Sequence, residues 1–320
     1  MKISPYLNIN RIEFFVTYQC SGKCKHCSVG DKLNHFDGFR HIKILEAAQA
    51  IRQVSEMFSV SSVMTFGGEP LLYPDVVCAI HEKASSVGIE ARQLITNGYF
   101  TKDDEHRRQV AIALKDAGIN CLLLSVDAFH HETIPFQAVY QFAKHAKESG
   151  IPDIRLHPAW VVNREHNNPY NAKTKEIIAG FSDLAIPVSD GNNIFMSGNA
   201  AKNLAEYYDE PHLDLLETCG TMPYTAPLNN LTSLSVVPNG DVMVCGFVIG
   251  NIYRQNMQDI IDHYNPYEDE WMSAVLHGGA RELLELSKRK GYAVDVSSCY
   301  SVCDLCHKIN NLRLSGNFHE

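Results

Sequence analysis

Three cysteines near the start of the chain have the spacing of a metal-binding motif. Cys20, Cys24 and Cys27 form a C-x3-C-x2-C pattern directly after the apolar run Ile12–Thr17. Three thiolates can bind three irons of a cubane cluster and leave the fourth iron open for a substrate ligand, whereas ferredoxin-type sites use four cysteines. Taken alone, the motif is also compatible with a structural zinc site.

A second motif follows the next expected strand, Ser62–Phe66. It consists of Gly67, Gly68, Glu69 and Pro70. Glycines let the backbone approach a ligand closely, and a carboxylate suits an ammonium partner. Polar residues also occupy later expected strands or their ends, namely Asn97, Ser125, Asp127 and Arg155. Strand-end capping or surface polarity is the alternative for these four residues.

The two motifs together resemble those of the radical S-adenosylmethionine (radical SAM) superfamily. The resemblance implies that Cys20, Cys24 and Cys27 hold a [4Fe–4S] cluster, and that S-adenosylmethionine binds its open iron through amino and carboxylate groups. It further implies that residues 67–70 contact the methionyl amino group and that His26 packs near the adenine, unless His26 is an exposed loop residue. The remaining expected cofactor contacts, to ribose or carboxylate, are Asn97, Ser125, Asp127 and Arg155.

The resemblance also implies a reaction. A reductant such as flavodoxin or ferredoxin supplies an electron, and S-adenosylmethionine is cleaved to methionine and a 5′-deoxyadenosyl radical that abstracts a hydrogen atom from substrate. The cofactor performs the difficult step, and the protein orients the groups around it.

A second group of cysteines lies near the end of the chain. Cys219, Cys245 within a G-x4-C element, and a terminal C-x2-C of Cys303 and Cys306 resemble the twitch and SPASM extensions of the same superfamily. This resemblance implies one auxiliary [4Fe–4S] cluster with these four ligands. Cys299 is left as a spare thiol, an alternative ligand or a hydrogen-atom donor to a substrate radical. Tetrahedral zinc is the alternative for this site.

These motifs need a scaffold that places strand ends together. Residues 12–188 alternate apolar runs with amphipathic stretches, in about six strand–helix units, which predicts a parallel sheet with helical crossovers. A closed eight-unit barrel needs about 250 residues, so we expect an α/β fold with a partial (β/α)6 TIM-like barrel in residues 1–205. The resemblance implies a small C-terminal α+β twitch-like iron–sulfur domain in residues 206–320. Within this range, the turn signal Pro238-Asn239-Gly240 predicts a hairpin.

Composition limits the class of function. The formal net charge of −9 argues against a nucleic-acid partner, which needs a basic surface. No apolar run is long enough for a membrane span, and the first residues lack the layout of a signal peptide. The ten cysteines then favour metal ligation in a cytoplasmic enzyme over disulfides.

The substrate remains open between two classes. Peptide modification, by crosslinking, epimerisation or oxidation, is favoured because enzymes with such extensions often perform it, although no leader-binding domain is expected before Cys20. The alternative is a small-molecule transformation, for example dehydrogenation of a sugar or aminocyclitol. A non-enzymatic iron–sulfur or zinc scaffold is disfavoured, because it has no use for the motif at residues 67–70.

Overall fold

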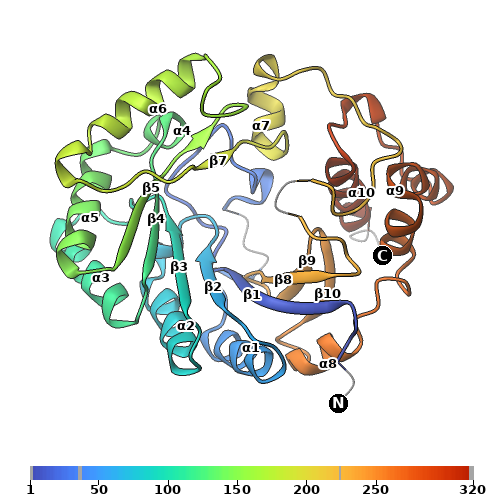
Figure 1. Ribbon diagram of the computed structural model, residues 1–320, viewed down its shortest axis with the longest axis horizontal. Helices are drawn as coiled ribbons and strands as arrows, with labels where there is room; N and C mark the ends of the chain where they lie inside the picture. The colour runs from blue at the N-terminus through green and yellow to red at the C-terminus, as the bar shows by residue number, and fades with distance from the viewer. Residues whose placement is uncertain (1–2, 35–37, 223–224, 317–320) are drawn as a thin grey trace.

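The computed structural model describes residues 3–34, 38–222 and 225–316. Its N-terminal part alternates strands and helices as expected (Figure 1). The strands are β1 (Leu7–Phe15), β2 (Ser62–Phe66), β3 (Ala91–Thr96), β4 (Cys121–Ser125) and β5 (Asp153–His157). The principal helices are α1 (Ile44–Met57), α2 (Pro74–Ser86), α3 (Asp104–Asp116), α5 (Phe136–Ser149) and α6 (Pro169–Ala179).

One eight-stranded sheet organises the molecule. Its strand order is β10-β9-β8-β1-β2-β3-β4-β5, and the pairs from β1 to β5 are all parallel. Helices α1, α2, α3 and α5 line its outer side (Figure 1). This arrangement confirms the α/β class with a parallel, partly closed sheet.

The core lies between this sheet and its outer helices. Ile12 and Phe14 of β1 are fully buried, together with Ile51 and Val54 of α1 and Ile80 of α2. Alternate residues of each strand point to the opposite, inner face. The carboxyl ends of β1 to β4 therefore present their loops at one rim of the sheet, where the two sequence motifs fall.

The C-terminal strands continue the same sheet rather than forming a separate one. Strand β8 (Leu231–Val236) pairs in parallel with β1, and β9 (Asp241–Val244) and β10 (Phe247–Asn251) add antiparallel strands at the edge. The hairpin expected at Pro238-Asn239-Gly240 is present between β8 and β9. The expected boundary between residues 205 and 206 therefore does not separate two sheets.

Three helices complete the C-terminal part. They are α8 (Met257–Asp262), α9 (Glu270–Arg289) and α10 (Val302–Gly316). The sequence predicts two helices here, over residues 270–277 and 280–290, and the structure joins them across a kink at Gly279, whose φ is 60° and ψ −147°. The kink brings the backbone of Glu217 against α9, because Ala280 donates its N–H to the Glu217 carbonyl at 2.9 Å.

Some local expectations were wrong. The apolar pattern predicts one strand over residues 153–162, but the structure divides this range at Pro158 into β5 and a short β6 (Ala159–Trp160), which pairs with β7 (Asn192–Asn193). Proline lacks the N–H that a continuous ladder needs. The pattern of Thr101 with Asp104 three residues later predicts that Thr101 opens α3, but Asp103 is its N-cap residue and accepts a hydrogen bond from the Glu105 N–H. No helix among the described residues is long and apolar enough to cross a membrane.

Candidate functional site

The cysteine motif occupies the loop between β1 and α1. Cys27 donates its backbone N–H to the Cys24 carbonyl at 3.2 Å, which closes a tight turn. The Cys20 sulfur accepts hydrogen bonds from the Gly22 N–H at 3.3 Å and from the Asn97 amide at 3.6 Å. A residue at the end of β3 thus contacts the first cysteine of the motif.

The three cysteines open onto one cavity of about 470 Å³. Its other lining residues come from both motifs and from the ends of β3, β4 and β7. Of the residues expected to contact the cofactor, those that line it are His26, Gly67, Gly68, Asn97 and Ser125. Glu69, Pro70, Asp127 and Arg155, all described, are not among its lining residues. Lysine, arginine, aspartate and glutamate are absent from this lining in the described part of the chain.

The cysteine thiols form a donor set that fits an iron–sulfur cluster. Burial, followed by the nearby Glu69 carboxylate, raises the pKa of Cys20 to about 12, and Cys24 and Cys27 add to the effect. Thiols in such surroundings ionise readily only when a metal replaces their protons. The three convergent sulfurs therefore suit a cationic metal centre better than a free, reactive thiol.

The glycines of the second motif pack directly against the cysteine loop. Gly67 has a φ of +144°, and a Cβ atom at this position would lie 2.5 Å from the Thr17 carbonyl oxygen. A Cβ on Gly68 would overlap the carbonyl of Gln19. The N–H groups of Gly68 and Glu69 donate to Thr17 and Gln19, each at 2.7 Å. Only glycine allows the two loops to approach this closely.

Glu69 has a different environment from the one its motif suggested. Its side chain is fully buried, and its carboxylate accepts hydrogen bonds from the Leu71 N–H at 2.9 Å, the Thr96 hydroxyl at 2.6 Å and the Asn97 N–H at 2.8 Å. Burial raises its pKa to about 7, against the opposing effect of these donors. The carboxylate thus ties its own loop to the end of β3.

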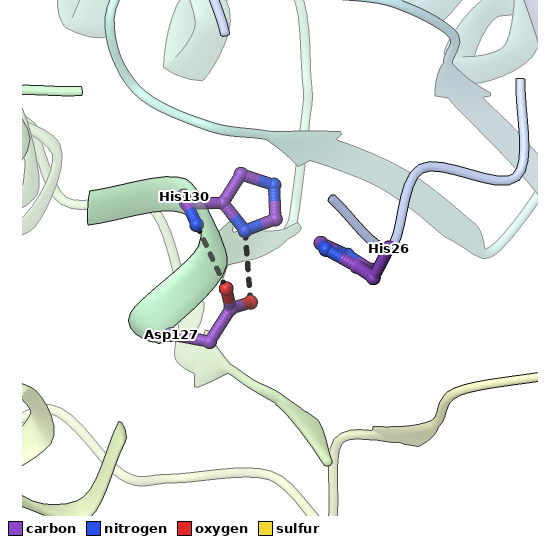
Figure 2. Close-up of side chains that lie close together, drawn as sticks. All are labelled: His26, Asp127 and His130. Carbon is purple, nitrogen blue, oxygen red and sulfur yellow. Dashed lines mark hydrogen bonds and ion pairs between the residues drawn. The ribbon is translucent and has the colours of Figure 1, made fainter. Parts of the chain in front are cut away.

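Asp127 also makes its hydrogen bonds inside the protein rather than toward the cavity. It is fully buried, and it accepts hydrogen bonds from the N–H groups of Phe129, His130 and Ala159 and from the His130 ring (Figure 2). Burial opposes ionisation, but the neighbouring His130 outweighs it and holds the pKa of Asp127 below its ordinary value. The carboxylate positions a histidine rather than facing the cavity.

His130 is a cavity residue that the sequence patterns did not reveal. Its Nδ1 lies 2.8 Å from Asp127 Oδ2, and it lines the cavity together with Cys24. Burial lowers its pKa, but Asp127 and Cys24 outweigh this effect and raise the pKa well above the ordinary value. The spacing of Asp127 and His130, an N-cap residue with a histidine three positions later, is the signal that identifies such a pair.

His26 lies beside this pair. Its ring centroid is 5.2 Å from that of His130 and 4.9 Å from that of Phe129. Burial lowers its pKa to about 4, despite the partly compensating charge of Asp127, and its Nδ1 has no hydrogen-bond partner among the described residues. Ligand atoms of His26, Asp127 and His130 all lie within 4.8 Å of one another. Because both Asp127 oxygens are already occupied, the three form a hydrogen-bonding and packing network.

Two expected site residues lie elsewhere. Arg155 is exposed on β5 and forms an ion pair with Asp153 at 2.9 Å. Cys299 is fully buried in the C-terminal core, where its thiol lies 3.6 Å from the Asp295 carbonyl oxygen and 3.8 Å from Lys308 Nζ. Neither residue lines the cavity.

The other four C-terminal cysteines converge. Cys306 lies close enough to Cys219, Cys245 and Cys303 for all four thiols to interact electrostatically. Burial, together with these neighbours, raises the pKa of Cys303 to about 11 and that of Cys306 well above its ordinary value. No such interaction joins them to Cys299 in the described structure. The donor set therefore fits a metal centre that replaces four protons.

Glu217 holds these cysteines in place. Its carboxylate accepts the Val302 N–H at 2.7 Å at the start of α10, which carries Cys303 and Cys306. Its carbonyl accepts the Ala280 N–H at the α9 kink. Glu217 therefore connects the segment before Cys219 to α9 and to α10.

The fold and the thiol-lined cavity together define an iron–sulfur enzyme on a partial β/α barrel. Residues 14–197, more than half of the chain, match the Radical SAM superfamily, and the chain belongs to this family. It is a radical SAM enzyme, and membership implies a [4Fe–4S] cluster, S-adenosylmethionine, a substrate and a reductant.

Sequence relatives cover only part of the chain. GTP 3′,8-cyclase of Moorella thermoacetica is 27% identical over 169 residues, 50% of this chain and 49% of its own length. GTP 3′,8-cyclase of Limosilactobacillus fermentum is 32% identical over 121 residues, 38% of this chain and 34% of its own length. The match thus spans about half the length of these relatives, or less.

Two solved structures align over most of the chain. BtrN in complex with AdoMet and 2-DOIA covers 86% of this chain and 91% of its own, with 17% identity and a TM-score of 0.47. Histidine-tagged anSMEcpe with bound AdoMet covers 94% and 98%, with 14% identity and a TM-score of 0.49.

Proposed function

We propose that the enzyme binds its [4Fe–4S] cluster through Cys20, Cys24 and Cys27 and cleaves S-adenosylmethionine in the adjoining cavity. The observation that carries this proposal is that the three thiols and the Gly67–Gly68 turn line the same cavity. When bound, the reduced cluster supplies the electron that splits S-adenosylmethionine and yields the 5′-deoxyadenosyl radical for hydrogen abstraction. A flavodoxin or ferredoxin is the proposed reductant.

The residues around the cavity have separate tasks in this proposal. Gly67 and Gly68 keep the backbone close to the cysteine loop, so that main-chain groups meet the methionyl amino group. The polar side chains of Asn97 and Ser125 are available for the ribose or carboxylate. Glu69 does not line the cavity, and it acts indirectly, because its three hydrogen bonds fix the turn and the end of β3.

The test is a triple substitution of Cys20, Cys24 and Cys27 by alanine. Formation of 5′-deoxyadenosine under dithionite should be abolished, while about four irons remain if an auxiliary cluster exists. Undiminished 5′-deoxyadenosine production would overturn the assignment. Glu69→Ala removes internal hydrogen bonds to a buried carboxylate, worth roughly 1.5–3 kcal/mol each, so it should lower the free energy of unfolding and weaken S-adenosylmethionine binding only through loss of the turn's geometry.

We further propose that residues 206–320 form a twitch-like unit with one auxiliary [4Fe–4S] cluster on Cys219, Cys245, Cys303 and Cys306. The convergence of these four thiols supports this set. Cys219→Ala should lose the second cluster, and Cys299→Ala should retain both when iron and EPR signals are measured after anaerobic reconstitution. Tightly bound zinc in protein purified without air would contradict the proposal.

For the substrate we propose a peptide. The cavity lining without Lys, Arg, Asp or Glu among the described residues supports this choice. Peptide groups need only neutral donors and acceptors, whereas phosphate groups are bound best by charged donors such as arginine. The main competing candidate is GTP, because the sequence relatives are GTP 3′,8-cyclases.

The two substrates can be compared directly. With S-adenosylmethionine and dithionite, GTP should neither raise 5′-deoxyadenosine formation nor be consumed. A peptide encoded beside the gene should raise it and change in mass. Consumption of GTP would overturn the peptide proposal, and turnover of a sugar or aminocyclitol would do so equally.

A further inference from the structure

We propose that the side-chain amide of Asn97 donates a hydrogen bond to the Cys20 sulfur when this thiolate holds the cluster, and thereby raises the reduction potential of the cluster. Asn97 acts through Cys20 and is therefore a positioning residue. The inference rests on the proposed function, because it takes Cys20 as a cluster ligand.

The first step concerns the place of Asn97 in the fold. It follows Thr96, the last residue of β3, and only 5% of its surface is exposed. Its backbone N–H donates to the buried Glu69 carboxylate at 2.8 Å, which ties this strand end to the loop between β2 and α2. Asn97 and Cys20 both line the cavity. The main chain at Asn97 is therefore fixed beside the cysteine loop.

The second step concerns the direction of the side-chain amide. Its Oδ1 accepts the Tyr99 N–H at 2.8 Å, and a backbone N–H can only donate. The amide NH2 group therefore lies on the other side, 3.6 Å from Cys20 Sγ and 3.3 Å from Ser21 Oγ. An amide nitrogen carries two protons, so each of these two atoms can receive one. The proton on the Ser21 side remains available to the cofactor, so the bond to Cys20 does not compete with a contact to the ribose or carboxylate.

The third step concerns the sulfur. Cys20 Sγ accepts two N–H groups, from Gly22 at 3.3 Å within the motif itself and from Asn97 on a different strand. The Gly22 donor belongs to the main chain, so it persists when side chains are replaced. The Asn97 donor can be removed by one substitution. A thiolate is a charged acceptor, so it receives these hydrogen bonds more strongly than a neutral thiol does.

The fourth step is the effect on the cluster. Hydrogen bonds to the sulfurs are among the factors that set the potential of an iron–sulfur cluster. The reduced cluster carries one more negative charge than the oxidised cluster, so a donor stabilises the reduced form more. Loss of the donor therefore lowers the potential and makes the cluster harder to reduce. A residue that only shaped the loop would change stability without changing the potential.

Two substitutions at position 97 and one control test this inference. Asn97→Ser keeps a side-chain oxygen for the Tyr99 N–H, as serine does in comparable turns, but removes the amide donor. Asn97→Asp keeps the size and the oxygen, and it places a carboxylate beside the sulfur. Asn120→Ser is the matched control. The Asn120 amide also joins chain segments, through the Arg92 N–H and the Glu90 carbonyl, but Asn120 does not line the cavity.

The measurement is the midpoint potential of the cluster. Anaerobically reconstituted proteins are titrated potentiometrically at one pH and followed by EPR, and the signal that changes on addition of S-adenosylmethionine identifies the cluster of the first motif. Asn97→Ser should shift its reduction equilibrium about three- to tenfold, which is about 30–60 mV, to lower potential. Asn97→Asp should shift it in the same direction by about tenfold or more, which is about 59 mV or more. Asn120→Ser should leave the midpoint unchanged.

The outcomes separate the two proposals. Wild-type midpoints in both Asn97 variants at full iron content, or an equal shift in Asn120→Ser, would overturn this inference and leave the proposed function standing. Absence of a cluster that responds to S-adenosylmethionine in the wild-type protein would instead overturn the proposed function. If one Asn97 variant binds no iron, the other decides. If neither binds iron while Asn120→Ser binds it in full, Asn97 builds the loop instead, and the inference is equally overturned.

Discussion

The kink of α9 at Gly279 should be essential for the auxiliary cysteine site. Gly279 has φ 60° and ψ −147°, close to the region that glycine almost alone occupies. A Cβ atom here would overlap the Glu217 carbonyl oxygen, which accepts the Ala280 N–H at 2.9 Å. Gly279→Ala therefore combines backbone strain, a clash with backbone and the loss of one hydrogen bond.

The magnitude follows from these three contributions. Strain costs about 1–3 kcal/mol, overpacking about 1–3 kcal/mol and the hydrogen bond about 1 kcal/mol. We expect Gly279→Ala to lower the free energy of unfolding by about 3–7 kcal/mol. Gly291 offers a matched control, because its φ is +82° and a Cβ there meets nothing within 4 Å. Gly291→Ala should cost only about 1–2 kcal/mol.

Guanidinium denaturation of both variants gives the two free energies, and iron analysis gives cluster content. Gly279→Ala should also bind fewer irons, because Glu217 connects the segment before Cys219 to α10. Equal destabilisation by the two substitutions would show that contact with Glu217 contributes nothing. Full iron content in a strongly destabilised Gly279→Ala variant would show that metal binding at the auxiliary site does not depend on the kink.

Three further predictions concern the barrel. His81 is fully buried against Thr65, and burial lowers its pKa to about 3. Below pH 6.5 the unfolded chain binds a proton at His81 that the folded protein does not. The free energy of unfolding therefore falls by about 1.4 kcal/mol per pH unit between pH 6.5 and 3, and the contribution of His81 is complete above pH 6.5. Denaturation at pH 7.5 and 5.5 should show a steeper loss for wild type than for His81→Gln, and parallel losses would refute this. Gly68→Ala, whose Cβ overlaps the Gln19 carbonyl, should lose 5′-deoxyadenosine formation yet keep its circular dichroism spectrum. Arg155→Ala should leave the dissociation constant for S-adenosylmethionine within about twofold, and a tenfold increase by calorimetry would restore Arg155 to the site.

Much of the barrel could be predicted because hydrophobic periodicity and turn residues act locally. The strand expected at Ser62–Phe66 agrees with β2, and the helices that the periodicity predicts over Pro74–Ser86 and Phe136–Ser149 agree with α2 and α5. Pairing between distant segments has no such local signal. The parallel pairing of β8 with β1, which joins residue 231 to residue 7, could not be read from either strand alone.

In the site, too, the sequence indicates which residues are present better than where their side chains point. The spacing of the two motifs was sufficient to predict that the three cysteines and both glycines lie at one site, and they line one cavity. Asp127 and Arg155 were expected there because they end or occupy strands, but a side chain's direction depends on its partners. Asp127 turns inward to four donors, and Arg155 pairs with Asp153.

His130 shows that a side chain's role depends on its partner more than on its residue type. His130 and His131 are adjacent histidines, yet one hydrogen-bonds the Asp127 carboxylate and the other a main-chain carbonyl. The difference arises from Asp127, whose position as N-cap residue places its carboxylate beside the Nδ1 of the residue three positions later. An aspartate that follows a barrel strand and precedes a histidine by three residues therefore indicates a positioned imidazole.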